Sequence, residues 1–328
     1  MTPDAAFDPA EVVVASLPMT TRFRGITTRE AMLVRGPAGW GEWSPFLDYS
    51  GDEIVPWWRA CVEWATTKPP PPVRDTVPVN CTVPAVDADR AHRIAADSGC
   101  RTAKIKIAEP GQTEADDLAR IEAVADALGP TGRVRVDANG AWDVDEAERR
   151  MRVLARYGLE YVEQPCAEVT ELAEVRSRLA RADVDIAIAA DESIRRAEDP
   201  WRVVELEAAD VAVLKVQPLG GVRACLELAD RLPMPVVVSS ALETSVGLAA
   251  GVALAAALPE LPYACGLNTA ALLAADVAEP SLRASDGTLP VGRVLPDPGL
   301  LVRHRVGPAR ERFWHDRLTI TQHRNERP

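Results

Sequence analysis

Three acidic residues, Asp137, Glu163 and Asp191, each stand at the end of a short run with the alternation of a β-strand. They are separated by 163 − 137 = 26 and 191 − 163 = 28 residues, which is room for one strand, one helix and two short loops. Carboxylates at the same ends of neighbouring strands can converge on one divalent ion, because a hard cation such as Mg²⁺ takes oxygen ligands. Taken singly, each acid could instead cap the helix that follows it.

Lysines occur at similar positions. Lys104 and Lys106 lie in the run Ala103–Ile107, and Lys215 ends the run Val211–Lys215. Residues two apart in a strand share a face, so Lys104 and Lys106 point to one side and the two isoleucines of the run to the other. Lys-Ile-Lys alone would be typical of a solvated edge strand. Together with the acids, the lysines predict a site that binds a metal ion and transfers protons.

Repeated strand–helix units extend from residue 79 to residue 295 and must position these side chains. Eight strand-like segments at intervals of roughly 25 residues favour a barrel of parallel strands over an open sheet, with the catalytic side chains at the carboxyl ends of the strands. No GxGxxG motif follows the first strand, which argues against a dinucleotide-binding fold. The predicted strands are Val79–Val83, Ala103–Ile107, Arg133–Asp137, Tyr161–Glu163, Ile186–Asp191, Val211–Lys215, Pro235–Ser240 and Tyr263–Gly266.

The two ends of the chain have a different composition. All four phenylalanines and six of the eight tryptophans lie outside 79–295. We therefore predict an α+β capping domain built from 1–78 and 296–328, and a barrel domain over 79–295. Within the first part, Glu11–Ser16 and Glu30–Arg35 read as strands, 36–39 as a hairpin turn, and Asp52–Thr67 as a helix before a proline-rich linker.

The order of these motifs resembles that of the enolase superfamily, in its muconate-lactonizing-type subgroup. The tract Ser239–Gly247 and the segment Gly41–Pro45 resemble the o-succinylbenzoate synthase family in particular. The resemblance covers nearly the whole chain and implies an α/β fold, a modified (β/α)7β barrel of the (β/α)8 type with a capping domain. The matching superfamily motifs are Lys104-Ile105-Lys106, Asp137-Ala138-Asn139, Glu163-Gln164-Pro165, Asp191-Glu192-Ser193 and Lys215.

The resemblance implies a role for each polar residue. Asp137, Glu163 and Asp191 would bind Mg²⁺, or Mn²⁺ in its place, with Asn139 and Glu192 in support. Lys106 would be the general base, the usual partner of Mg²⁺ in this superfamily. Its ammonium would be disfavoured by the metal, by Lys104 and by partial burial. Lys215 would approach from the opposite side, as a cation over the ring of the reacting molecule.

Substrate-binding residues are expected in two further regions. Hydroxyl and backbone N–H groups after the last two strands could bind a carboxylate, although each residue alone could equally belong to an ordinary turn. Met19–Gly25 resembles the loop that covers the substrate, and Pro45–Ser50 would close the other flank. The expected residues are Ser239, Ser240, Leu242, Thr244, Gly266 and Asn268 for binding, and Met19, Arg22 and Arg24 for the lid.

The reaction implied is the dehydration of 2-succinyl-6-hydroxy-2,4-cyclohexadiene-1-carboxylate to 2-succinylbenzoate, a step of menaquinone biosynthesis. Alternatives are an N-acylamino acid racemase or a dipeptide epimerase of the same superfamily, and a barrel that binds an anion without turnover. Dipeptide epimerases carry Asp-x-Asp at the end of the eighth strand, where this chain has Cys265-Gly266-Leu267-Asn268-Thr269 and no acidic residue. The similar racemases tend to carry arginine where this chain has Pro218.

Composition limits the partners. A net charge of −12 argues against nucleic acid and anionic membranes, so a small anionic substrate must be drawn in by a local positive site. The six cysteines are scattered and lack metal-finger spacing, which favours free thiols in a reducing cytoplasm. No signal peptide is recognised at the N-terminus, and the longest apolar run has 13 residues, too few to cross a bilayer. The sequence does not indicate the oligomeric state.

Overall fold

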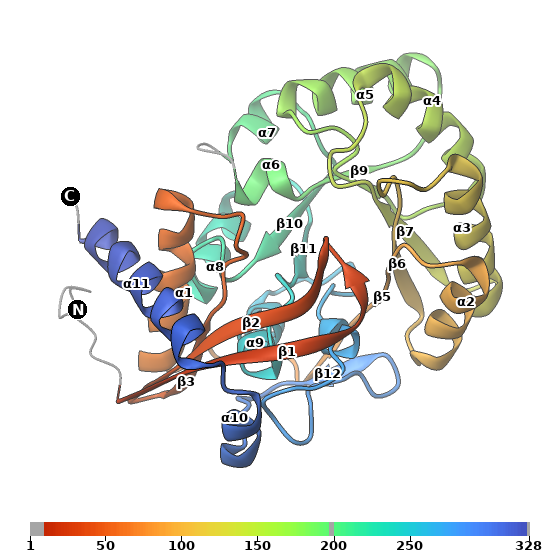
Figure 1. Cartoon of the computed structure of the whole chain (residues 1–328). Coiled ribbons are helices and arrows are strands. Elements are labelled where there is room, and N and C mark those ends of the chain that lie inside the picture. Colours follow the sequence, from red (N-terminus) through yellow and green to blue (C-terminus); the bar gives the residue numbers. More distant parts are fainter. Residues whose placement is uncertain (1–9, 197–199, 327–328) are drawn as a thin grey trace.

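A computed structural model of the chain describes residues 10–196 and 200–326 (Figure 1). Phe7, one of the aromatic residues counted above, lies outside the described residues. A small antiparallel sheet near the N-terminus stands against a larger curled parallel sheet whose outer face is covered by helices.

The antiparallel sheet consists of β1 (Glu11–Phe23), β2 (Ile26–Gly36) and β3 (Gly39–Trp43) in that order. The predicted strands Glu11–Ser16 and Glu30–Arg35 form its centre, and 36–39 makes the predicted hairpin turn, with Gly36 paired to Gly39. β1 and β2 run much further than the sequence indicated. Their connecting turn is Arg24-Gly25, with φ of +49° and +76°, a left-handed geometry typical of tight hairpins.

The curled sheet has the strand order β11-β10-β9-β8-β7-β6-β5, all parallel. In Figure 1, helices α2 to α5 form an arc around its outside. The strands are β5 (Cys81–Val83), β6 (Thr102–Lys106), β7 (Arg133–Asp137), β8 (Val162–Glu163), β9 (Ile188–Ala190), β10 (Val211–Lys215) and β11 (Val236–Ser239).

Helices connect these strands on the outside of the barrel. They are α2 (Ala88–Asp97), α3 (Glu114–Leu128), α4 (Val144–Leu154) with the 3₁₀ turn η2 (Ala155–Tyr157), α5 (Val169–Arg181), α6 (Glu192–Arg195), α7 (Arg202–Glu205), α8 (Val222–Arg231) and α9 (Ser245–Ala257). Helix α9 is buried over most of its length beneath the capping sheet. Among the described residues, no helix is both long and apolar enough to cross a membrane.

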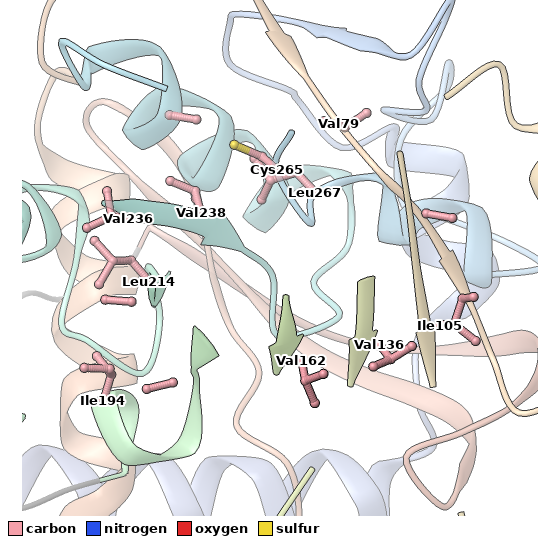
Figure 2. Packing of buried hydrophobic residues seen from close by; sticks show 14 of the residues in the cluster. Val79, Ile105, Val136, Val162, Ile194, Leu214, Val236, Val238, Cys265 and Leu267 are labelled. Atoms are coloured by element: carbon pink, nitrogen blue, oxygen red, sulfur yellow. The ribbon is translucent and has the colours of Figure 1, made fainter. Parts of the chain in front are cut away.

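Alternation along the strands separates the hydrophobic core from the site. Ile105, Val136, Val162 and Leu214 are completely buried and belong to the large cluster between strands and helices, part of which Figure 2 shows. Their neighbours in sequence therefore face the barrel interior. The charged residues among these neighbours are Lys104, Lys106, Arg135, Asp137, Glu163 and Lys215.

The eighth predicted strand, Tyr263–Gly266, is shorter than expected. Only Cys265 and Gly266 pair, the former with Val79 and the latter with Ser239, as isolated bridges. These pairs still close the barrel between β11 and the start of β5. The strand does not extend further back because the Ala264 carbonyl accepts a hydrogen bond from Arg135 (2.7 Å), and Pro262 has no N–H to donate.

The C-terminal part returns to the capping sheet. Helix α11 (Pro308–Asn325) packs against α1 (Val55–Thr66), and Trp314 joins Trp43 and Trp58 in one buried aromatic cluster. The ring centroids of Trp43 and Trp314 are 5.6 Å apart in a T-shaped arrangement. The remaining elements are η1 (Gly51–Ile54), η3 (Asn268–Leu272), α10 (Pro298–His304), and the two-stranded sheet of β4 (Thr76–Pro78) with β12 (Thr288–Pro290).

Candidate active site

The acids and lysines predicted from the sequence meet at the carboxyl ends of the barrel strands. Register pairs Lys106 with Asp137, and Asp137 in turn with Glu163. Asp191 directly follows β9, the next strand. β6 and β10 are four positions apart in an eight-position barrel, so Lys106 and Lys215 approach from opposite sides.

The three carboxylates are almost fully buried, and each contacts a lysine. Lys106 Nζ lies 2.6 Å from Asp137 Oδ2, Lys104 Nζ lies 2.6 Å from Glu163 Oε1, and Lys215 Nζ lies 2.6 Å from Asp191 Oδ2. Lys104 Nζ is also 3.2 Å from Asp137 Oδ2. The site is thus a compact network of opposite charges inside the barrel.

Burial and charge shift the titration of this network. Burial and the nearby Asp137 raise the pKa of Glu163 to about 7. Although burial opposes ionisation, Lys106 and Lys104 hold the pKa of Asp137 below its usual range. Burial also disfavours the Lys104 ammonium, but the carboxylates of Glu163 and Asp137 outweigh it and raise the pKa of that lysine. For Lys215 burial prevails and lowers the pKa.

The donor set fits a hard divalent ion by its chemistry: three carboxylates on adjacent strands, with Glu163 Oε2 buried and without a hydrogen-bond partner. Within the described ranges, however, no three carboxylate, thiol or imidazole side chains form a ready-made metal cage. Each carboxylate is turned toward a cation, so a bound ion would compete with the lysines for these oxygens.

A cavity with about 50 Å³ of free space lies against this network, much too small to admit a ring with a four-carbon side chain. Both domains line it. Phe23 and Arg24 come from the tip of the β1–β2 hairpin and Phe46 from the loop after β3. The barrel contributes Thr82, Lys104, Lys106, Asp137, Asn139, Arg195, Lys215, Ser239, Ser240, Ala241, Leu242, Gly266 and Thr269. A wider groove of about 790 Å³ lies outside the barrel beside α5, but no residue of the lysine–carboxylate network lines it.

The supporting residues lie beside the network. Asn139 accepts a hydrogen bond from Lys106, and its backbone N–H donates to Asp137 Oδ1 (3.0 Å). Glu192 begins α6 and accepts from Asn139 Nδ2 (3.4 Å) and from Arg195. Asn139 therefore connects the proposed base to the acids.

Most of the expected binding residues line the cavity, but Thr244 and Asn268 do not. Thr244 is the N-cap of α9, and its hydroxyl donates to Glu42 Oε2 (2.6 Å). The Asn268 side-chain oxygen accepts from the backbone N–H of Ala284 (3.0 Å). Both side chains are thus engaged by the fold.

Of the three residues expected in the lid, only one lines the cavity. Arg24 lines the cavity, whereas Met19 pairs with Leu273 of the barrel and Arg22 is exposed. Phe23 covers Lys106, with the centre of its ring 5.5 Å from Lys106 Nζ. The hairpin tip thus closes the site directly over Lys106.

Sequence reasoning missed Arg195, whose Nε lies 2.8 Å from Asp191 Oδ1. It is 5% exposed, and it also donates a short hydrogen bond to the hydroxyl of Tyr49 in the capping domain. Arg195 stands four residues after Asp191, and side chains four residues apart on a helix are neighbours. This spacing is the sequence feature that could have predicted their contact.

Comparison with known proteins gives consistent matches. Residues 87–305 match the model of the enolase C-terminal domain-like family, and residues 14–65 match that of the enolase N-terminal domain-like family. An o-succinylbenzoate synthase of Thermobifida fusca is 64% identical over 307 residues, covering 94% of each chain. One from Mycobacterium tuberculosis is 54% identical, covering 93% of this chain and 91% of the relative.

Solved structures show the same fold at lower identity. A muconate lactonizing enzyme from Pseudomonas fluorescens, complexed with muconolactone, has a TM-score of 0.76 at 22% identity, covering 90% of this chain and 98% of that one. An N-succinyl Arg/Lys racemase from Bacillus cereus has a TM-score of 0.74 at 17% identity, covering 90% and 97%. At these identities the likeness concerns the fold alone.

Proposed function

Since this chain belongs to the enolase superfamily and, within it, to the o-succinylbenzoate synthases, we propose which residues carry out its dehydration reaction. The chain is a carbon–oxygen lyase that acts on a small molecule. Enzymes of the superfamily use a divalent metal ion.

We assign Asp137, Glu163 and Asp191 as the ligands of one Mg²⁺, with Mn²⁺ as a substitute. Their burial at the ends of three adjacent strands supports the assignment, and so does the unpartnered oxygen of Glu163. When bound, the ion supplies positive charge where the ring carboxylate gains negative charge during proton removal.

Lys106 removes the proton from the ring carbon next to the carboxylate of 2-succinyl-6-hydroxy-2,4-cyclohexadiene-1-carboxylate. The bond from the neighbouring ring carbon to its hydroxyl group then breaks, and protonated Lys106 returns the proton to that oxygen, which leaves as water. The product is 2-succinylbenzoate. Because one group takes and returns the proton, removal and departure occur on one face of the ring.

Lys215 faces the ring from the other side, where its ammonium stabilises the reacting ring by a cation–π interaction with the ring face. Phe23 excludes water above Lys106. The observation that carries the proposal is the placement of Lys106 and Lys215 on opposite sides of one cavity, with the acids between them.

The deciding experiment is a spectrophotometric assay with the cyclohexadiene substrate and Mg²⁺, in which aromatisation is followed in the ultraviolet. Turnover that stops on chelation and resumes with Mg²⁺ supports the assignment. A protein that binds the substrate without aromatising it would contradict the assignment and favour an anion-binding barrel.

The proposal extends to the setting of the enzyme: menaquinone biosynthesis in the cytoplasm, with a capping domain of 1–78 and 296–328 and a barrel of 79–295. The cytoplasmic setting is supported by the cysteines, because all six are free and buried. A fusion to a fluorescent protein would test the location in the cell. Limited proteolysis, with cleavage expected near residues 73 and 295, would test the division into domains.

A further inference from the structure

Arg29, which no sequence motif singled out, is a buried arginine of strand β2 in the capping sheet, 2% exposed and outside the cavity. Its guanidinium reaches across to the barrel. Nε donates to the Leu242 carbonyl (2.9 Å) and Nη2 to the Ala241 carbonyl (3.1 Å). Nη2 also donates to the hydroxyl of Ser44 (3.0 Å) at the end of β3 and, through a short contact, to its carbonyl.

Ala241 and Leu242 form part of the cavity wall, and this wall has an unusual backbone. Leu242 has φ of +63°, a left-handed conformation that is costly for a residue with a branched side chain. Such a conformation persists only where neighbouring groups hold it. The two hydrogen bonds from Arg29 to consecutive carbonyls provide that restraint.

The direction of these carbonyls determines what the wall presents to the substrate. In a trans peptide the C=O and the following N–H point in opposite directions. Since the Ala241 carbonyl points to Arg29, the Leu242 N–H points away from it, toward the Ser240 hydroxyl at a long 3.4 Å. Ser240 and Leu242 both line the cavity, so a weakly engaged N–H and a hydroxyl lie together on its wall. The Ser240 hydroxyl also shares a hydrogen bond with the hydroxyl of Thr269 (2.7 Å), another residue of this wall, which leaves one of the two hydroxyl groups free to donate to a ligand.

We propose that Arg29 is a positioning residue for the substrate side chain: by holding the two carbonyls it aims the Leu242 N–H and the Ser240 hydroxyl at the oxygen atoms of the succinyl group. The inference rests on the proposed function and adds to it a residue that touches no substrate atom. It assigns to Arg29 an effect on affinity for the side chain and none on proton transfer.

A second residue of the capping sheet holds the other end of the wall. Glu42 accepts hydrogen bonds from the Thr244 N–H (3.1 Å) and the Gly247 N–H (3.2 Å) at the N-terminus of α9. A Cβ atom on Gly247 would lie 2.7 Å from Glu42 Oε2, so the absence of a side chain there allows this close approach. The wall from Ala241 to Thr244 is thus held at both ends by the capping sheet.

The charge of Arg29 strengthens its contacts. Burial lowers the pKa of Arg29 to about 10, so the guanidinium remains protonated at neutral pH. Hydrogen bonds from a charged donor are roughly twice as strong as neutral ones. Replacing Arg29 should therefore free the carbonyls of Ala241 and Leu242 to reorient, and should leave the positions of Lys106 and the three acids unchanged.

The test compares two ligands that share the ring carboxylate but differ in the side chain, 2-succinylbenzoate and benzoate. In Arg29→Met we expect the inhibition constant of 2-succinylbenzoate and the KM of the substrate to rise about tenfold or more. The reason is that the Leu242 N–H and the Ser240 hydroxyl would no longer point at the succinyl group, which would lose its hydrogen bonds to them. The inhibition constant of benzoate should stay within about twofold and kcat within about threefold. Equal weakening of both ligands, or a fall in thermal stability alone, would overturn the positioning role.

Two further variants make the test specific. Arg223→Met removes an arginine that also crosses between the domains, to Glu63 (2.8 Å), but does not contact the wall, so it should leave the ratio of the two inhibition constants unchanged. If Arg29→Met does not fold, Arg29→Lys tests the idea. Its single ammonium cannot span both carbonyls, and the ratio should change by an intermediate factor; an unchanged ratio would overturn the proposal. A wild-type enzyme that bound both ligands equally would contradict the proposed function itself.

Discussion

Lys106 and Asp137 are register partners on neighbouring parallel strands, and Lys106 Nζ lies 2.6 Å from Asp137 Oδ2. The pairing of β6 with β7 at this position therefore places the proposed base beside a proposed metal ligand. The arrangement makes the backbone of β6 and β7, rather than a loop, responsible for the distance between them. Strand-borne groups are held more rigidly than groups on loops.

Replacing Lys106 tests the base directly. Lys106→Ala should abolish dehydration, by more than the 10²–10⁴-fold typical of losing general acid–base catalysis, because the same amine also returns the proton. The side chain is partly accessible, so the fold should survive, as circular dichroism would verify. A variant that retained more than about a tenth of the wild-type rate would show that the base is another residue.

The metal site is tested at Asp191. Asp191→Asn should weaken Mg²⁺ binding and activity together, because it removes a carboxylate charge from the ligand set. Calorimetric titration of Mg²⁺ measures the first effect and the ultraviolet assay the second. Asp210→Asn is the matched control: its carboxylate pairs with Arg176 at the outer groove and contacts no residue of the lysine–carboxylate network, so affinity should change little. Full activity in metal-free buffer with chelator would disprove the metal assignment.

Strand periodicity made much of this site predictable. Because alternate residues of a strand face opposite sides, the positions of Lys104 and Lys106, and the spacing of the acids, were sufficient to predict a barrel with a polar interior. Arg29 and Glu42 were not predictable in this way. Arg29 contacts Leu242, 213 residues away in sequence, and Glu42 contacts Thr244, 202 residues away.

The length of the β1–β2 hairpin also escaped prediction. Register shifts between Pro18 and Phe23, so the alternation expected of a continuous strand is broken there. The eighth strand was overestimated for the opposite reason: its residues look like a strand, but contacts with the barrel interior occupy part of its backbone. Both differences depend on partners distant in the chain.

The pH dependence of stability should reveal Glu42. Burial and the nearby Glu243 raise the pKa of Glu42 to about 7, from an ordinary value of 4.5. Between these values the folded chain binds more protons than the unfolded chain, so the stability from this group is full below pH 4.5 and is lost as pH rises through 7. In wild type this lowers the unfolding free energy by up to about 3 kcal/mol.

Glu42→Gln has no proton to lose and should remove that slope. Urea unfolding at pH 5 and pH 8 would show a smaller loss of stability in Glu42→Gln than in wild type. Burial raises the pKa of Glu163 and Glu243 as well, so these groups contribute slopes of the same sign in both proteins. Because Glu243 and Glu42 repel each other, removing the Glu42 charge also reduces the slope from Glu243, which changes the comparison in the same direction. Parallel stability curves for the two proteins would show that Glu42 does not titrate in this range.

The closing segment of the barrel shapes the cavity at Gly266. A Cβ atom there would lie 2.5 Å from Ser239 Oγ, so Gly266→Ala must displace Ser239, which lines the same cavity. We expect KM to rise several-fold with a smaller change in kcat. Gly292→Ala is the control, because its Cβ would meet nothing within 4 Å. Unchanged KM in Gly266→Ala would mean that the wall yields without affecting the substrate.

Substrate scope follows from the charges that line the cavity. Its ionisable groups are five cations and one acid: Arg24, Lys104, Lys106, Arg195, Lys215 and Asp137. At the end of the closing segment, where dipeptide epimerases have Asp-x-Asp, Gly266 and Thr269 face the cavity and offer no carboxylate. A substrate ammonium would be buried without a partner, at a cost of several kcal/mol, so dipeptides should bind poorly.

Racemase activity should also be weak. The position three residues after Lys215, where the similar racemases tend to carry arginine, is Pro218, which is buried and has neither charge nor a backbone donor. Incubation with an N-succinyl amino acid in D₂O, followed by NMR and polarimetry, measures α-deuterium exchange and loss of optical rotation. We expect both to be slower than dehydration by orders of magnitude. Exchange at a rate near that of dehydration would instead establish a bifunctional enzyme, in which Lys106 and Lys215 act as paired acid and base on opposite faces of the α-carbon.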